Sequence, residues 1–172
     1  QGVLLTYYRN SIMHILALPS LVARNFRHSE TLSRRDLIDR CARLYPFLKR
    51  ELFIHYSLDE VEAVLGSIVD AMVEQGLLRA SAEDLLSRPS IGSSSYSVLI
   101  GLGRILRETF ERYTITSLML VRDISESPAP RSAVEKHAIH MAHRLAILSG
   151  RMAPEYHDKN LFRQYLDSLI SL

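Results

Sequence analysis

Three histidines form the first group of residues in this sequence whose types and spacing could do chemistry. His137, His140 and His143 recur at every third position, so on a helix neighbours differ by about 60° around the axis and share a face. Closely spaced histidines on a helix can bind a metal ion. No Cys, Asp or Glu accompanies them at a matching spacing. The sequence therefore favours structural or solvent-exposed histidines over a metal site, and it predicts no cofactor.

A second group places polar side chains inside an apolar helix near the start of the chain. Its members are Tyr7, Tyr8, Arg9 and Asn10, with His14 one turn further along. Buried polar groups need hydrogen-bond partners, so we expect this group to bond across a packed interface. A role beside a substrate is the alternative.

A third group, Tyr156, His157, Asp158 and Lys159, combines a base, an acid and a cation. A helix cap with ordinary surface charges explains it equally well. The sequence contains no P-loop, dinucleotide fingerprint, nucleophile elbow or zinc-ligand spacing.

Charge is distributed unevenly along the chain. Residues 24–50 contain eight Lys or Arg residues against three acids, whereas residues 57–84 are mainly acidic. Within the basic segment, Arg24, Arg27, Arg34 and Arg35 are the best candidates for a contact surface. A solvated face with internal ion pairs is one interpretation. The other is a surface for anionic lipid headgroups or an acidic partner.

Composition narrows the class of protein. Of 172 residues, 47% are hydrophobic, which allows a core and argues against disorder. The single cysteine, Cys41, fits a reducing compartment. No stretch reaches the roughly 18–20 uncharged residues of a spanning helix. The chain starts with Gln1 and stops within a helical pattern, so we expect a piece of a longer protein.

The elements that must position these groups are mostly helices. The pattern predicts a helix over residues 3–26, which Pro19 should kink or divide. Ser33 should cap a second helix, and Pro46 permits a new start. Ser57 and Glu60 form a capping box for a helix that Gly76 ends. Residues 77–80 and 86–91 could then pair as short strands.

Three more helices are predicted after the hairpin. A long one covers residues 96–121, Ser132 and Glu135 form a second capping box, and Asp158 caps the last helix. The expected fold is mainly α, a helical bundle with one short, winged-helix-like β-hairpin, and the resemblance described next implies that it is the C-terminal domain of a larger protein. We expect a linking helix over residues 1–30 and a helical domain over 31–172, which could divide into 31–91 and 92–172.

Several blocks of the sequence resemble the region that follows the catalytic domain in bacterial membrane-bound glycerol-3-phosphate acyltransferases. In chain order the blocks are GVLLTYYRN (2–10), LPSL (18–21), LYPFLKRELF (44–53), QGLL (75–78), RETFERY (107–113), AHRLAILSG (142–150) and APEY (153–156). They follow the family's order and cover nearly the whole chain.

The resemblance implies a parent enzyme that transfers an acyl group from acyl-carrier protein or coenzyme A to sn-glycerol 3-phosphate. This reaction of phospholipid synthesis takes place at the cytoplasmic face of the inner membrane. The family's catalysis uses a His and an Asp separated by four residues. No histidine here has Asp at that spacing, and the family's Arg-bearing phosphate motifs are missing. The resemblance thus implies a catalytic domain upstream as partner, peripheral membrane contact, and no catalytic residue in this chain.

A winged-helix module that binds proteins or nucleic acid is the competing hypothesis. A helix that ends at Gly76 and is followed by a hairpin fits such a module. The helix before the hairpin is acidic and would repel phosphate, so we expect no nucleic acid partner.

Overall fold

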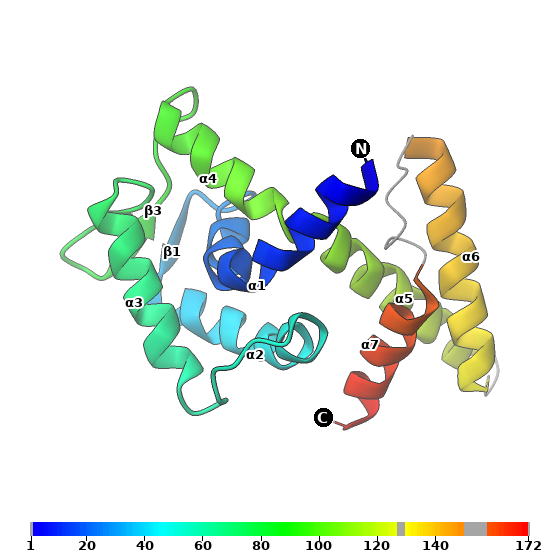
Figure 1. Ribbon diagram of the computed structural model, residues 1–172. Helices are drawn as coiled ribbons and strands as arrows, with labels where there is room; N and C mark the ends of the chain where they lie inside the picture. Colours follow the sequence, from blue (N-terminus) through cyan, green and yellow to red (C-terminus); the bar gives the residue numbers. More distant parts are fainter. Residues whose placement is uncertain (1, 127–129, 150–157, 172) are drawn as a thin grey trace. The chain divides into compact units, whose positions relative to one another are not determined.

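The computed structural model describes residues 2–126, 130–149 and 158–171, apart from the side chains of residues 2–11, Ile124, Glu126 and Ser149. Within these residues the chain is mainly helical, as predicted (Figure 1). It forms two compact units, Gln1–Leu106 and Arg107–Leu172, and each is described by itself.

The first unit contains four helices and a small sheet among its described residues. In chain order the elements are α1 (Gly2–Asn25), β1 (Thr31–Ser33), α2 (Arg34–Leu52), α3 (Val61–Glu74), β2 (Arg79–Ala80), β3 (Leu85–Ser87) and α4 (Ser94–Arg104). Helix α1 contacts α2, α3 and α4 and lies among them in Figure 1. Its second half is largely buried from Ala17 to Ala23, because apolar residues occupy most sides of the helix.

Local signals set several helix ends as the sequence predicts. The Ser33 hydroxyl accepts a hydrogen bond from the Asp36 backbone N–H at 3.0 Å, which satisfies one free donor of α2. The Ser57 backbone N–H donates to the Glu60 carboxylate at 2.8 Å, and the Glu60 N–H donates to the Ser57 hydroxyl at 3.3 Å. The capping box ahead of α3 is therefore confirmed. Gly76, at φ +68°, follows the end of α3 as predicted.

Neither proline divides its helix. Pro19 lies inside α1 and Pro46 lies inside α2, and both helices continue past them. Of the two outcomes predicted for Pro19, a kink or a division, the division does not occur, and helix α2 does not start anew at Pro46. A proline removes only one helical hydrogen bond, and the flanking turns gain more by packing: Leu18 and Leu21 beside Pro19 are almost completely buried.

The predicted long helix over residues 96–121 is two helices. Helix α4 ends at Arg104 and α5 begins at Arg107. Between them, the Ile105 N–H donates to the Leu102 carbonyl at 3.1 Å, a tighter i→i−3 bond. Leu106 is fully buried at this break, so packing accounts for a break that the apolar periodicity does not reveal.

The predicted hairpin exists, with shorter strands than expected and with a third strand beside it. Strand β3 pairs antiparallel with both β1 and β2, in the order β1-β3-β2. Leu86, at the centre of β3, faces both Leu32 and Ala80 in the register and is fully buried. Strand β1 has only three residues, which is too short for a periodicity signal.

The single thiol is buried where α1 and α2 meet. Asn25 Nδ2 donates to the Leu21 carbonyl at 2.9 Å and lies 3.5 Å from Cys41 Sγ. Burial raises the pKa of Cys41 to about 12, partly offset by the Asn25 hydrogen bond. The thiol packs here as a small apolar group.

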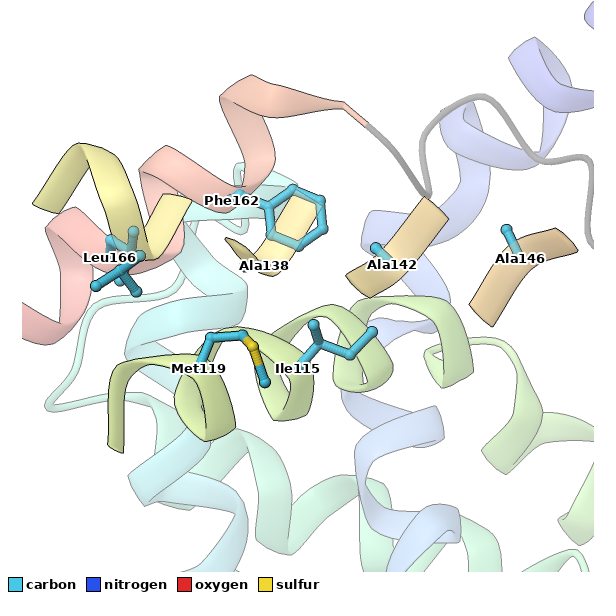
Figure 2. Close-up of a cluster of buried hydrophobic side chains, with 8 residues drawn as sticks. Ile115, Met119, Ala138, Ala142, Ala146, Phe162 and Leu166 are labelled. Atoms are coloured by element: carbon cyan, nitrogen blue, oxygen red, sulfur yellow. The ribbon is translucent and has the colours of Figure 1, made fainter. Parts of the chain in front are cut away.

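The described residues of the second unit form α5 (Arg107–Glu126), α6 (Arg131–Ser149) and α7 (Lys159–Ser171). Helix α6 contributes a line of alanines, and α7 covers them with Phe162. Figure 2 shows the labelled core residues, which are Ile115, Met119, Ala138, Ala142, Ala146, Phe162 and Leu166. Alanines spaced four apart share one face of α6, so their small side chains let the neighbouring helices approach closely.

The ends of α6 and α7 give one wrong and one confirmed prediction. Helix α6 already begins at Arg131, so Ser132 lies inside it and the second capping box was wrong. The Glu135 carboxylate instead lies 3.4 Å from Arg163 and 3.5 Å from Lys159 on α7. Asp158 caps α7, since its carboxylate accepts from the Asn160 N–H at 2.9 Å.

Candidate functional site: an apolar groove in the first unit

An apolar groove of about 580 Å³ opens between α1, the loop after α2, and α3. Its lining residues are His14, Ile15, Leu18 and Pro19 from α1, Ile54, His55 and Tyr56 from the loop, and Val64, Ser67, Ile68 and Ala71 from α3. The volume falls within the range of about 300–1,000 Å³ that is typical of small-molecule sites. The groove lies inside one compact unit, and its walls are helices that also form the core.

Two side chains of α2 hold the loop wall of the groove in place. Both the Tyr45 hydroxyl, at 2.6 Å, and the Lys49 ammonium donate hydrogen bonds to the Tyr56 carbonyl. Tyr45 and Lys49 lie one turn apart on α2 and therefore share a face. Burial is the main cause of the raised pKa of Tyr45, so its hydroxyl stays a donor at neutral pH. The groove is thus preformed.

Helix α2 reaches this loop through a left-handed residue. Phe53 has φ 53°, and its N–H donates to the Lys49 carbonyl. Glycine is the usual residue at such a position, because a Cβ there costs about 1–2 kcal/mol. The Phe53 side chain is 87% exposed, so no buried contact offsets the strain.

The polar side chains described in the groove can all form hydrogen bonds with a ligand. They belong to His14, His55, Tyr56 and Ser67, and the Ser67 hydroxyl already donates to the Ala63 carbonyl at 3.1 Å. No carboxylate or thiol is among the described lining residues, and none of the described contacts pairs the Ser67 hydroxyl with either histidine. Glu60, which precedes α3, accepts hydrogen bonds from Ser57, and these hydrogen bonds are the main reason that its pKa is lowered.

The structure places one member of the predicted interface group in this groove. His14 is exposed on α1 and forms part of the wall. The side chains of Tyr7, Tyr8, Arg9 and Asn10 lie outside the described residues. His55 and Tyr56 were not singled out from the sequence, and no spacing rule connects them to His14, because three separate segments form the groove.

The predicted basic surface has members in different environments. Arg34 forms ion pairs with Asp70 and, at 3.4 Å, with Asp84, and the hydrogen bond to Asp70 is the main cause of its raised pKa. Arg27 and Arg35 are exposed. Arg34 thus holds α3 and the hairpin to α2, whereas Arg27 and Arg35 face solvent.

Arg24 and Arg27 line a small cavity of about 40 Å³ with Arg104 on α4. Gly103 brings the two helices together here, because a Cβ at Gly103 would lie 3.1 Å from the Arg24 backbone nitrogen. The sequence analysis missed Arg104, which lies outside the basic segment.

The three histidines of α6 differ in their contacts. His137 Nδ1 lies 2.8 Å from the buried Asp123 carboxylate on α5, and Arg122 bonds the same carboxylate at 2.7 Å. Hydrogen bonds from His137 and Arg122 hold the pKa of Asp123 below its usual value. His140 and His143 are exposed. Among the described residues, no group of three or more His, Cys, Asp or Glu side chains could hold a metal ion.

The third chemical group divides between described and undescribed residues. Tyr156 and His157 lie outside the described part of the chain. Asp158 caps α7, and the Lys159 ammonium lies 3.5 Å from Glu135. Both described members therefore have structural contacts.

The sequence matches, over residues 1–172, the family described as the glycerol-3-phosphate acyltransferase C-terminal region. The chain belongs to this family. A glycerol-3-phosphate acyltransferase of Pseudomonas paraeruginosa is 41% identical over 171 residues, and one of Pseudomonas fluorescens (strain Pf0-1) is 39% identical over the same length. Each match covers 99% of this chain and 20% of the relative, so the chain spans about a fifth of the length of these relatives.

No solved structure matches this C-terminal region, so the winged-helix resemblance is not confirmed. The block at residues 44–53, by which the sequence resembles the acyltransferases, contains Tyr45 and Lys49, which hydrogen-bond to the groove loop, and Phe53, at which α2 passes into it. None of the helices, as far as the structure describes them, is both long and apolar enough to span a bilayer.

Proposed function

We propose that this chain is the non-catalytic C-terminal part of a glycerol-3-phosphate 1-O-acyltransferase. An upstream domain of the parent enzyme would transfer the acyl group from acyl-carrier protein or coenzyme A to sn-glycerol 3-phosphate, in phospholipid synthesis. The family match over the whole chain carries this proposal. The absence of a His-x4-Asp motif from the sequence supports a non-catalytic role.

A domain exchange tests the proposal directly. The matching fifth of the Pseudomonas paraeruginosa relative is replaced by this chain, and formation of 1-acylglycerol 3-phosphate is measured with acyl-coenzyme A. The chimera should be active, whereas the relative without the region and the 172-residue chain alone should be inactive. Turnover by the chain alone, or a folded but inactive chimera, would contradict the proposal.

The first part of α1 is the proposed contact with the upstream domain. It contains Tyr7, Tyr8, Arg9 and Asn10, and His14 follows one turn later as an exposed residue. Removing one partner of a buried charged contact costs about 3–5 kcal/mol. In the chimera, Arg9→Ala should therefore lower both the melting temperature and the activity. The exposed Arg79, on β2, supplies the control Arg79→Ala, and equal effects of the two substitutions would refute the contact.

The basic surface is proposed to face anionic lipid or acyl-carrier protein at the cytoplasmic side of the inner membrane. Arg24, Arg27, Arg34 and Arg35 belong to it, and the exposed Arg27 and Arg35 are the residues to test. Each such charge contributes about 1 kcal/mol near an anionic bilayer.

Vesicle flotation of the chimera at low salt compares Arg27→Glu/Arg35→Glu with Arg79→Glu, in anionic and in neutral lipid. Only the double variant should lose recovery, and only with anionic vesicles. If flotation and acyl-carrier-protein kinetics matched those of the control in both lipids, Arg27 and Arg35 would belong to a solvated face.

A further inference from the structure

The groove in the first unit is shaped for a ligand with a long apolar part and a small polar end. Aliphatic side chains from α1 and α3 form its walls, among them Ile15, Leu18, Val64 and Ile68. Among the side chains that the structure describes, no Asp, Glu, Lys or Arg lines the groove. Transfer of apolar surface from water to such walls is favourable in proportion to the area buried.

Two exposed segments of the groove lining, around His14 and around His55, supply most of its hydrogen-bonding groups. His14 on α1 and His55 in the loop are both exposed, and Tyr56 adds a phenol beside His55. Imidazole and phenol groups can donate to a carboxylate or ester oxygen. Because no Asp or Glu is among the described lining side chains, these side chains do not repel an anionic end group.

The walls do not need to rearrange for a ligand to enter. The shared Tyr56 carbonyl fixes the loop to Tyr45 and Lys49. Leu18 is nearly fully buried and belongs to the core, while Ile15, one turn away, is 64% exposed toward the opening. A preformed apolar site loses little conformational entropy on binding.

We propose that this groove binds one fatty acyl chain, with the polar end of the ligand at His14 and His55. The choice of an acyl chain among apolar ligands rests on the proposed function, because acyl groups are the apolar substrate of that reaction. The occupant is a single acyl chain of a monomeric amphiphile, and neither a bilayer nor a protein helix.

The test is a fluorescence titration of the 172-residue chain with cis-parinaric acid, without vesicles. Ala71 is exposed on α3 and lines the groove. A helical side chain leans toward the preceding turn, so Ala71→Trp should fill the space above Ser67 and Ile68. Ala82 is exposed in the turn between β2 and β3, and Ala82→Trp is the matched control. Ile15→Asn makes the opposite wall, on α1, more polar without adding volume.

The wild type and Ala82→Trp should bind saturably with the same Kd, and palmitate should displace the probe while glycerol 3-phosphate does not. Ala71→Trp and Ile15→Asn should each weaken binding by about tenfold or more, with unchanged circular dichroism. No saturable binding by the wild type, or equal binding by all four proteins, would overturn the proposal. So would an Ala71→Trp chimera that loses acyltransferase activity although its isolated chain binds the probe normally, because the groove would then contact protein.

The titration involves no catalysis, so its failure leaves the domain-exchange result intact. Conversely, an inactive chimera combined with groove-specific binding would reject the proposed function and keep the acyl site.

Discussion

The two units of the chain are both helical, but different contacts hold them together. The first has a core of large side chains, such as Phe26, Tyr45 and Leu86, and it leaves an apolar groove open to solvent. The shorter second unit packs around small alanines and buries acidic groups, Asp123 and Glu135, against cationic partners. Small domains bury a smaller fraction of their surface, so the second unit depends more on its few large apolar residues and on charge.

The largest effect should come from the one large aromatic residue that covers the alanines. Phe162 is completely buried on α7, so Phe162→Ala should lower the free energy of unfolding of the second unit by about 3–5 kcal/mol. Ile170, on the same helix, is 73% exposed. Ile170→Ala should therefore change the free energy of unfolding by less than about 0.5 kcal/mol. Hydrogen exchange read separately in each unit checks this, and equal protection in both variants would contradict the packing of α7.

Two glycines on α4 test how closely the helices of the first unit are packed. Alanine at Gly103 would place a Cβ 3.1–3.3 Å from backbone atoms of Ala23 and Arg24, and such overpacking costs about 1–3 kcal/mol. A Cβ added at Gly101 would meet no atom within 4 Å, so alanine there should gain up to about 1 kcal/mol of helix propensity. Thermal unfolding should therefore move in opposite directions for Gly103→Ala and Gly101→Ala. Shifts of the same sign would mean that α1 and α4 are not in close contact.

Acid should affect the second unit through Asp123. The pKa of Asp123 is lower in the folded chain than in the unfolded one, so its contribution to stability is complete above the unfolded pKa and is lost as pH falls through the folded pKa. Asp123→Asn should be less stable than wild type near about pH 7, and the difference should shrink below about pH 4. Urea unfolding across this range is the measurement, with the exposed Asp39→Asn in the first unit as control. A difference that did not depend on pH would exclude the charge of Asp123 as the cause.

The smallest effect is expected at Phe53, where the first unit holds a strained residue beside its groove. Phe53→Gly removes the left-handed penalty of about 1–2 kcal/mol and adds glycine's entropy cost of about 0.5–1 kcal/mol. A net gain between zero and about 1.5 kcal/mol should follow. Phe53→Ala keeps the Cβ, and thus the strain, so its melting temperature should stay near that of wild type. An equal rise for both variants would point to the exposed ring instead of the backbone.

Local signals predicted the ends of elements better than their continuity. Ser33, the Ser57–Glu60 pair and Asp158 act within a few residues of the chain, and their hydrogen bonds are as expected. Pro19 misled, because the burial of its neighbours outweighs one lost hydrogen bond. The break before Arg107 has no cap or proline of its own, so only the packing of Leu106 reveals it.

The candidate site was less predictable than the fold. His14 drew notice as a polar residue in an apolar helix, but its partners in the groove come from the loop at residues 54–56 and from α3. Long-range proximity of this kind has no period in the sequence. For Arg34, the charge suggested a partner outside the chain. Its ion-pair partners, Asp70 and Asp84, instead belong to the same unit.

The buried thiol of Cys41 offers a way to measure the opening of the first unit. Cys41 is the only cysteine in the sequence, and it is buried where α1 meets α2 with its pKa raised to about 12. Only the thiolate reacts with alkylating reagents, so modification at neutral pH requires the two helices to separate first. The labelling rate, divided by that of the unfolded chain, then gives the equilibrium constant for this separation. Labelling of the native Cys41 thiol can thus measure how often the α1–α2 contact opens, without any engineered probe.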